Sequence, residues 1–186
     1  MSGEFAIAVA AILLIAALVA TVVVIRTRRV VATPAERTVH TTLHTAAVAA
    51  RALRQGLDAE SARDAVPHLL ELTGAQGVAL YDPDAILLAR APAEHPVWAA
   101  DTPARSQQAA ADAAAERRRT LSGQAPWLIA QPLLPDDSEV LGVLVVATET
   151  PPGPGMLGAV GEVARYATSQ LELAELDASR ARLDRA

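Results

Sequence analysis

The longest apolar stretch of the chain is residues 5–25, which contain no charged residue and no proline. As a helix rising about 1.5 Å per residue it would measure about 32 Å, close to the hydrocarbon thickness of a bilayer. Three arginines follow it directly, whereas a signal peptide would carry its basic residues in front. We therefore expect residues 1–29 to form a transmembrane anchor with a basic cytoplasmic flank and the N-terminus outside.

Two helices are predicted after this segment, and each begins at a capping residue. Thr33 precedes a proline and, three residues on, a glutamate, which is typical of a capping box. Asp58 is the candidate N-cap of a second helix that runs to about Thr73. Pro67 falls inside this second helix and is expected to kink it or delay its start.

Four short apolar runs separated by turn residues predict strands. Residues 77–81 and 85–90 flank an Asp-Pro-Asp turn, and residues 127–134 and 139–148 flank a second turn, so two hairpins are expected. A helix is expected between them at 102–120, ending in three arginines. Because cations suit a helix C-terminus, a solvated helix end is favoured there over an anion site.

The run 139–148 is apolar on both of its faces. Val140, Leu144 and Val146 alternate with Leu141, Val143 and Val145. A strand with one face in water would alternate apolar and polar residues instead. The sheet is therefore predicted to be covered on both sides, which gives an α+β fold class.

Apolar and small residues recur at steps of three and four through residues 155–186. They are Leu157, Val160, Ala164, Ala167, Leu171, Ala174, Ala178 and Ala181, with Leu173, Leu176 and Leu183 on a neighbouring face. This spacing predicts one long helix with a coiled-coil seam. Packing on its own domain is an equal alternative as far as Leu171, but alanines beyond that point bury too little area to dock a lone helix. No C-cap residue follows Leu183, so we expect the helix to continue.

Composition and charge exclude several functions. All 16 basic residues are arginines, and beyond residue 29 there remain 13 arginines against 20 acids, a formal charge of −7. Such a domain should repel nucleic acid, so none is expected as a partner. The chain has no cysteine, which excludes disulfides, thiolate metal sites and cysteine nucleophiles and fits a reducing compartment.

The stretch 91–101 follows neither a helix nor a strand pattern and is predicted to be an irregular loop over a cavity. His95 and Trp98 are expected to face the sheet here, with Tyr81 nearby, so that hydrogen-bond donors stand in an apolar wall. These three residues are the predicted ligand-binding site. Ordinary packing of Trp98 in a core is the alternative.

No catalytic residue, metal site or cofactor is predicted. His40 and His44 lie one helical turn apart, but no third ligand is near in the sequence, so a polar helix face is the better interpretation. No serine, histidine and acid set and no paired carboxylates stand out either.

Two stretches resemble the input region of LytS-type sensor histidine kinases. They are residues 33–82, TPAERTVHTTLHTAAVAARALRQGLDAESARDAVPHLLELTGAQGVALYD, and residues 161–183, GEVARYATSQLELAELDASRARL. In that family one membrane helix leads into a cytoplasmic GAF domain and then into the kinase core. The resemblance implies a GAF-like antiparallel sheet with helices on its faces over residues 30–154, followed by an output helix at 155–186.

The resemblance also implies a function, the membrane-anchored sensory region of a two-component sensor histidine kinase. A small molecule or another signal would be passed to a kinase core through a homodimeric helix, and a response regulator would be met only through that core. The implied location is the inner membrane, with a single span and the soluble domain in the cytoplasm.

Catalysis would belong to the parent protein rather than to these residues. The family's phosphoacceptor histidine and ATP-binding core lie beyond this region, and none of His40, His44, His68 and His95 matches the acceptor motif, so no catalytic residue is carried over. A stand-alone, membrane-tethered GAF regulator acting on a partner protein is the alternative.

Overall fold

The structure of the protein is a computed structural model that describes residues 34–135 and 139–185. The chain divides into two compact units, residues 1–41 and 42–186, and only the opening turns of helix α2 are described in the first. The predicted membrane helix at 5–25 lies outside the described residues. Among the helices that are described, none has the length and apolarity needed to cross a membrane.

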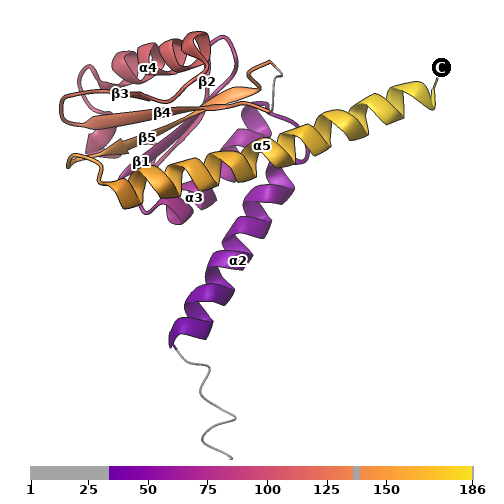
Figure 1. Ribbon diagram of the computed structural model, residues 1–186, viewed down its shortest axis with the longest axis horizontal. Helices are drawn as coiled ribbons and strands as arrows, with labels where there is room; N and C mark the ends of the chain where they lie inside the picture. Colours follow the sequence, from indigo (N-terminus) through magenta and orange to yellow (C-terminus); the bar gives the residue numbers. More distant parts are fainter. Residues whose placement is uncertain (1–33, 136–138, 186) are drawn as a thin grey trace, which may run out of the picture. The chain divides into compact units, whose positions relative to one another are not determined.

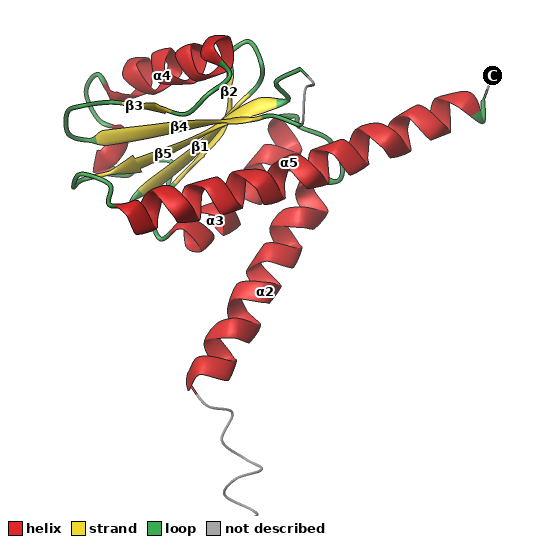
Figure 2. Cartoon of the chain, viewed as in Figure 1, coloured by secondary structure: helices red, strands yellow, loops and turns green. Residues whose placement is uncertain are grey.

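The described part of the chain combines helices with one sheet (Figure 2). The helices are α2 (Pro34–Leu53), α3 (Ala59–Thr73), α4 (Thr102–Glu116) and α5 (Pro154–Leu183), with a single 3-10 turn, η1 (Pro96–Trp98), before α4. The strands are β1 (Gly77–Tyr81), β2 (Leu87–Ala91), β3 (Thr120–Leu121), β4 (Trp127–Leu133) and β5 (Gly142–Thr148). The predicted α+β class is confirmed.

The sheet is antiparallel throughout, in the order β2-β1-β5-β4-β3. The hairpin between β1 and β2 is confirmed, although β2 begins two residues later than predicted. The reason is the turn, in which Ala85 has a left-handed backbone with φ of 59°. The Asp82 carboxylate stabilises this turn by accepting hydrogen bonds from the backbone N–H groups of Asp84 at 3.0 Å and Ile86 at 2.8 Å.

Both faces of the sheet are covered, as the sequence of the last strand predicted. Every residue of β5 is buried. Leu144 and Val146 lie in the core shared with α2, α3 and α5, whereas Val143 and Val145 lie in the core shared with η1 and α4. Figure 1 shows α4 on one side of the sheet and α3 and α5 on the other.

The start of α3 follows the predicted capping pattern. The Asp58 side chain accepts hydrogen bonds from the N–H groups of Glu60 and Ser61, and the Ser61 hydroxyl accepts one from the Asp58 N–H in return. Left-handed Gly74 closes the helix. The predicted delay at Pro67 is wrong, because the proline lies inside a helix that begins at Ala59.

The predicted coiled-coil stripe of α5 divides into two parts. Val160, Ala164, Ala167 and Leu171 are buried in the core of their own domain. Of the two alternatives predicted for this half of the helix, packing on its own domain is confirmed and the seam is not, because the stripe docks α5 on the sheet and α3. Residues 175–185 are exposed, so that no part of the described domain covers the stripe there.

The end of α4 differs from the prediction. The helix stops at Glu116 because Arg117 takes a left-handed conformation with φ of 52°, a position at which glycine is the usual residue. The three arginines therefore follow the helix rather than form its last turn. Thr120 and Leu121 make the short edge strand β3, which was not predicted.

Candidate ligand-binding site

Tyr81 ends strand β1 with its side chain on the α4 face of the sheet, where it is 2% exposed. Its hydroxyl forms a hydrogen bond of 2.7 Å with the Ser106 hydroxyl of α4, which is fully buried. Burial raises the pKa of the Tyr81 phenol above its ordinary value, and the hydrogen bond with Ser106 works against this increase. The neutral phenol thus links the sheet to α4.

Ser106 was not among the predicted site residues. It lies on the buried stripe of α4, with Thr102, Ala110 and Ala113. These small residues recur at steps of four, four and three, which is the signal that could have placed Ser106 on the sheet side.

The predicted irregular loop at 91–101 contains the 3-10 turn η1, and His95 is the N-cap of this turn. The His95 Nδ1 atom accepts a hydrogen bond of 3.1 Å from the Val97 N–H, so the half-buried imidazole is held by its own loop. Nδ1 must be unprotonated to accept this bond. The contribution of His95 to a ligand site stays a prediction.

Trp98 is 5% exposed and shares one apolar cluster with Tyr81. Its ring lies against the start of β1, because a Cβ atom at Gly77 would come within 2.7 Å of the Trp98 Cζ2 atom. This contact agrees with ordinary core packing, the alternative predicted for Trp98. Its Nε1–H group, however, is buried and has no hydrogen-bond acceptor among the described residues. An unpaired buried donor costs about 1–3 kcal/mol, so this is the atom of the site that an acceptor on a ligand would satisfy.

An open cleft of about 420 Å³ lies beside this cluster, between the turn after Tyr81 and the C-terminal half of α4. Its lining includes Asp84, Ala85, Ala114 and Glu139. Ala85 also belongs to the apolar cluster around Tyr81, but none of Tyr81, His95 and Trp98 is among the residues that line the cleft. The volume suits a small molecule, and the two carboxylates at the rim disfavour an anion.

The fold therefore brings together two of the three predicted site residues. Tyr81 and Trp98 belong to one buried cluster, while His95 stands at its edge as a cap. Within the described ranges, no group of three or more histidines and acids is arranged to hold a metal ion.

The fold is similar to that of GAF domains. The GAF domain of a phosphoenolpyruvate-protein phosphotransferase from Coxiella burnetii matches with a TM-score of 0.51 at 11% identity, over 74% of this chain and 96% of that one. The corresponding domain from Acinetobacter matches with a TM-score of 0.48 at 11% identity, over 73% and 95%. The GAF-B domain of DevS from Mycobacterium smegmatis matches with a TM-score of 0.46 at 24% identity, over 63% and 93%.

Neither a protein-family model nor a curated protein matches the sequence. At these identities the structural likeness concerns the fold alone. The predicted GAF-like fold is confirmed on the match to the Coxiella domain.

Proposed function

We propose that this chain is the membrane-anchored sensory region of a two-component sensor histidine kinase. A small molecule bound on the α4 face of the sheet would alter α5, and a homodimeric helix would pass the change to a kinase core. Residues 1–29 would anchor the chain in the inner membrane, with the N-terminus outside and the GAF-like domain in the cytoplasm. The response regulator would be met only through the kinase core.

The observation that carries this proposal is the division of α5 into a docked half and an exposed half. Four residues of the docked half, Val160, Ala164, Ala167 and Leu171, are buried in the domain core. The helix then continues without a break to Leu183, and at about 1.5 Å per residue its 30 residues span about 45 Å. A shift of the docked half would therefore move the exposed half with it.

A direct connection links α5 to the candidate ligand site. Strand β5 contributes Val143 and Val145 to the cluster around Tyr81, and only residues 149–153 separate this strand from α5. Two of those five residues are prolines, which stiffen the connection. Ligand binding that displaces β5 would thus be transmitted to α5.

The exposed half of α5 offers a leucine face for a second copy of the chain. Leu173, Leu176 and Leu183 are 41%, 55% and 77% exposed. With Arg180 between them they follow steps of three, four and three, the spacing of a coiled-coil seam. Leucines bury more apolar area than the alanines at 178 and 181, so we place the dimer contact on the leucine face.

Insertions into α5 of the full-length protein test this transmission. One alanine inserted after Asp177 turns the following residues by about 100°, whereas seven inserted residues turn them by about 20°. The one-residue insertion should make autophosphorylation permanently active or permanently inactive. The seven-residue insertion should leave autophosphorylation dependent on the ligand. Equal loss with both insertions would show that α5 is only a tether.

Cysteine crosslinking tests the dimer face. No other cysteine of the chain can form a crosslink, because the chain has no native cysteine. A cysteine at Leu176 should crosslink two copies more strongly than a cysteine at Glu175, which lies about 100° around the helix. Equal crosslinking at the two positions would reject the leucine seam.

The membrane topology and the kinase core have separate tests. An alkaline phosphatase fused after Ala186 should be inactive, and a fluorescent protein fused there should fluoresce, if the C-terminal side is cytoplasmic. The coding sequence after codon 186 should encode a kinase core. Its absence would favour the stand-alone tethered regulator.

A further inference from the structure

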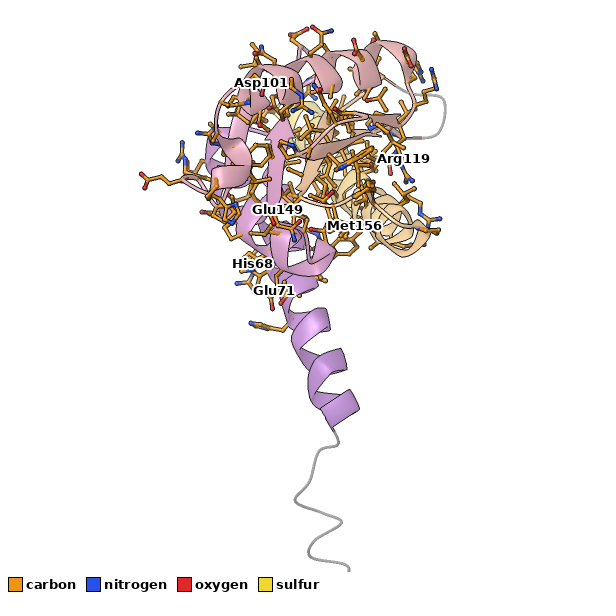
Figure 3. All side chains as sticks on the ribbon, turned by 90° about the vertical axis from the view of Figure 1, so that its left-hand side faces the viewer. His68, Glu71, Asp101, Arg119, Glu149 and Met156 are labelled. Carbon is orange, nitrogen blue, oxygen red and sulfur yellow. The ribbon has the colours of Figure 1, made fainter. Side chains whose placement is uncertain are left out.

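We propose that a groove on the α5 side of the sheet binds a small organic anion, carrying a carboxylate or phosphate group, through Arg119. The groove measures about 620 Å³ and runs between the first half of α5 and the β3–β4 edge of the sheet. Its lining includes Arg119, Gln131, Gly158, Gly161, Glu162 and Arg165. Figure 3 shows Arg119 on the side of the domain where α5 lies, away from Asp101 at the start of α4.

Arg119 is fixed at this groove by contacts on two sides. Its Nε–H donates a hydrogen bond of 2.7 Å to the Gln131 Oε1 atom on β4. On the other side its Nη2 atom lies 2.9 Å from the position that a Cβ atom would take at Gly161. A side chain at position 161 would therefore require the guanidinium to shift.

The charge of Arg119 is not neutralised by the described residues. The side chain is half-buried and forms no ion pair with a described carboxylate, although a guanidinium has five N–H donors. Its neighbour Arg118, in contrast, pairs with Glu116 at 2.6 Å. A planar guanidinium held in one orientation suits bidentate binding of a carboxylate or phosphate.

A second cation stands on the α5 side of the groove. Arg165 pairs with Glu162, and both side chains are more than 70% exposed. An exposed pair of this kind is weak, so Arg165 can turn to a stronger anionic partner. With Glu162 included, the groove carries a net positive charge on a chain whose formal net charge is −5. This is the reverse of the acidic cleft beside α4.

Helix α5 lines the groove with two glycines, Gly158 and Gly161. A Cβ atom at Gly158 would meet nothing within 4 Å, and the same holds at Gly155. Glycine is disfavoured inside a helix, and no contact in the described residues requires it at position 158. The open space above Gly158 gives the body of the anion a place beside the Arg119 guanidinium.

Thermal unfolding of the full chain, followed by tryptophan fluorescence in nanodiscs of uncharged phosphatidylcholine, tests the proposal. The probes are inorganic phosphate and succinate, each compared with sodium chloride at the same ionic strength. Anion binding to the folded state should raise the unfolding midpoint in a saturable manner. Arg119→Gln should weaken this response at least about tenfold, because it removes a charged hydrogen-bond donor.

Two matched pairs of variants separate binding from folding. Arg118→Gln changes the same charge one residue away and should keep the response. Gly158→Leu should abolish the response by placing a side chain in the groove, at a position where an added Cβ atom would meet nothing within 4 Å, whereas Gly155→Leu makes the same change on the same helix outside the groove lining and should keep it. Both leucine variants should unfold at or above the wild-type midpoint, because leucine favours a helix more than glycine does.

Three results would overturn the proposal. The first is the absence of a saturable response to both anions. The second is a response that survives Arg119→Gln and Gly158→Leu. The third is stabilisation only in nanodiscs of phosphatidylglycerol, which would assign the groove to lipid headgroups. None of these outcomes depends on the ligand site beside α4, so the two proposals can fail separately.

Discussion

The two faces of the sheet are equally buried but differ in what covers them. The core toward α2, α3 and α5 contains six buried leucines, an isoleucine and eight alanines. The core toward α4 and η1 contains a single buried leucine, Leu128, six alanines and the aromatic residues Tyr81 and Trp98. Strand β5 serves both, since Leu144 points to the first face and Val143 to the second.

Buried polar groups also differ between the two faces. On the face covered by α2, α3 and α5, the Thr73 and Thr168 hydroxyls donate hydrogen bonds to carbonyl groups of their own helices. On the α4 face the Tyr81 hydroxyl bonds across to Ser106, and the Trp98 N–H has no partner among the described residues. One face therefore supports the fold by close apolar packing, while the other combines small side chains with polar atoms that a ligand could use.

The largest loss of stability should come from shortening a leucine on the face of the sheet that α2, α3 and α5 cover. Leu144 and Leu128 are both fully buried, on neighbouring strands but opposite faces. Leu144→Ala should lower the free energy of unfolding by about 4–5 kcal/mol, and Leu128→Ala by about 2–3 kcal/mol, because the residues around Leu128 on the α4 face should relax further into the space left by the leucine. Urea unfolding of both variants measures this difference. Equal losses would mean that the two faces are packed equally tightly.

A smaller loss is expected when the Trp98 position is crowded. Gly77→Ala places a Cβ atom within 2.7 Å of the Trp98 ring and 2.8 Å of Val97. This overpacking should lower the free energy of unfolding by about 1–3 kcal/mol. In the background of Trp98→Leu the same change should cost clearly less, and a double-mutant cycle measures the coupling. Additive effects would show that Trp98 does not depend on the glycine.

The hydrogen bond between Tyr81 and Ser106 should contribute less. Tyr81→Phe is expected to lower the free energy of unfolding by about 0.5–1.5 kcal/mol. Because burial raises the folded-state pKa of Tyr81, the unfolded chain ionises first, and the wild type should lose stability as the pH rises above about 10. Unfolding between pH 8 and 11 should show a smaller loss in Tyr81→Phe. Tyr166 is present in both proteins, so an identical pH dependence would exclude this role for Tyr81.

The sequence predicted those parts of the fold that depend on local chemistry. Asp58 was predicted as the N-cap of α3 and Thr73 as its approximate end, and the apolar run of β5 required cover on both sides. The end of α4 was missed because an arginine, Arg117, occupies a left-handed position without a glycine signal.

Contacts between distant residues could not be predicted in the same way. The stripe of α5 has one spacing from Leu157 to Ala181, yet its first half docks on its own domain and its end is exposed. A periodic pattern indicates which side of a helix is apolar but not what covers it. Likewise, Arg119 meets Gly161 only because the sheet edge and α5 come together, although 42 residues separate them.

The smallest change in stability should follow from Trp98→Phe. The substitution removes the buried N–H that has no acceptor among the described residues, which favours folding, but it also removes part of a buried ring. These opposite effects should leave the free energy of unfolding within about 1 kcal/mol of the wild type. Chemical denaturation measures this, with Trp127→Phe, a half-buried residue of β4, as the matched control.

The same variant should affect ligand binding much more than stability. If the Nε1–H of Trp98 donates to the ligand, Trp98→Phe should weaken binding of any metabolite that stabilises the wild type by at least about tenfold, while Trp127→Phe should not. A loss of stability of about 3 kcal/mol with unchanged ligand response would instead assign Trp98 to packing alone. In that case the α4 face would serve as a second apolar core, and the difference between the two faces of the sheet would be one of side-chain size rather than of function.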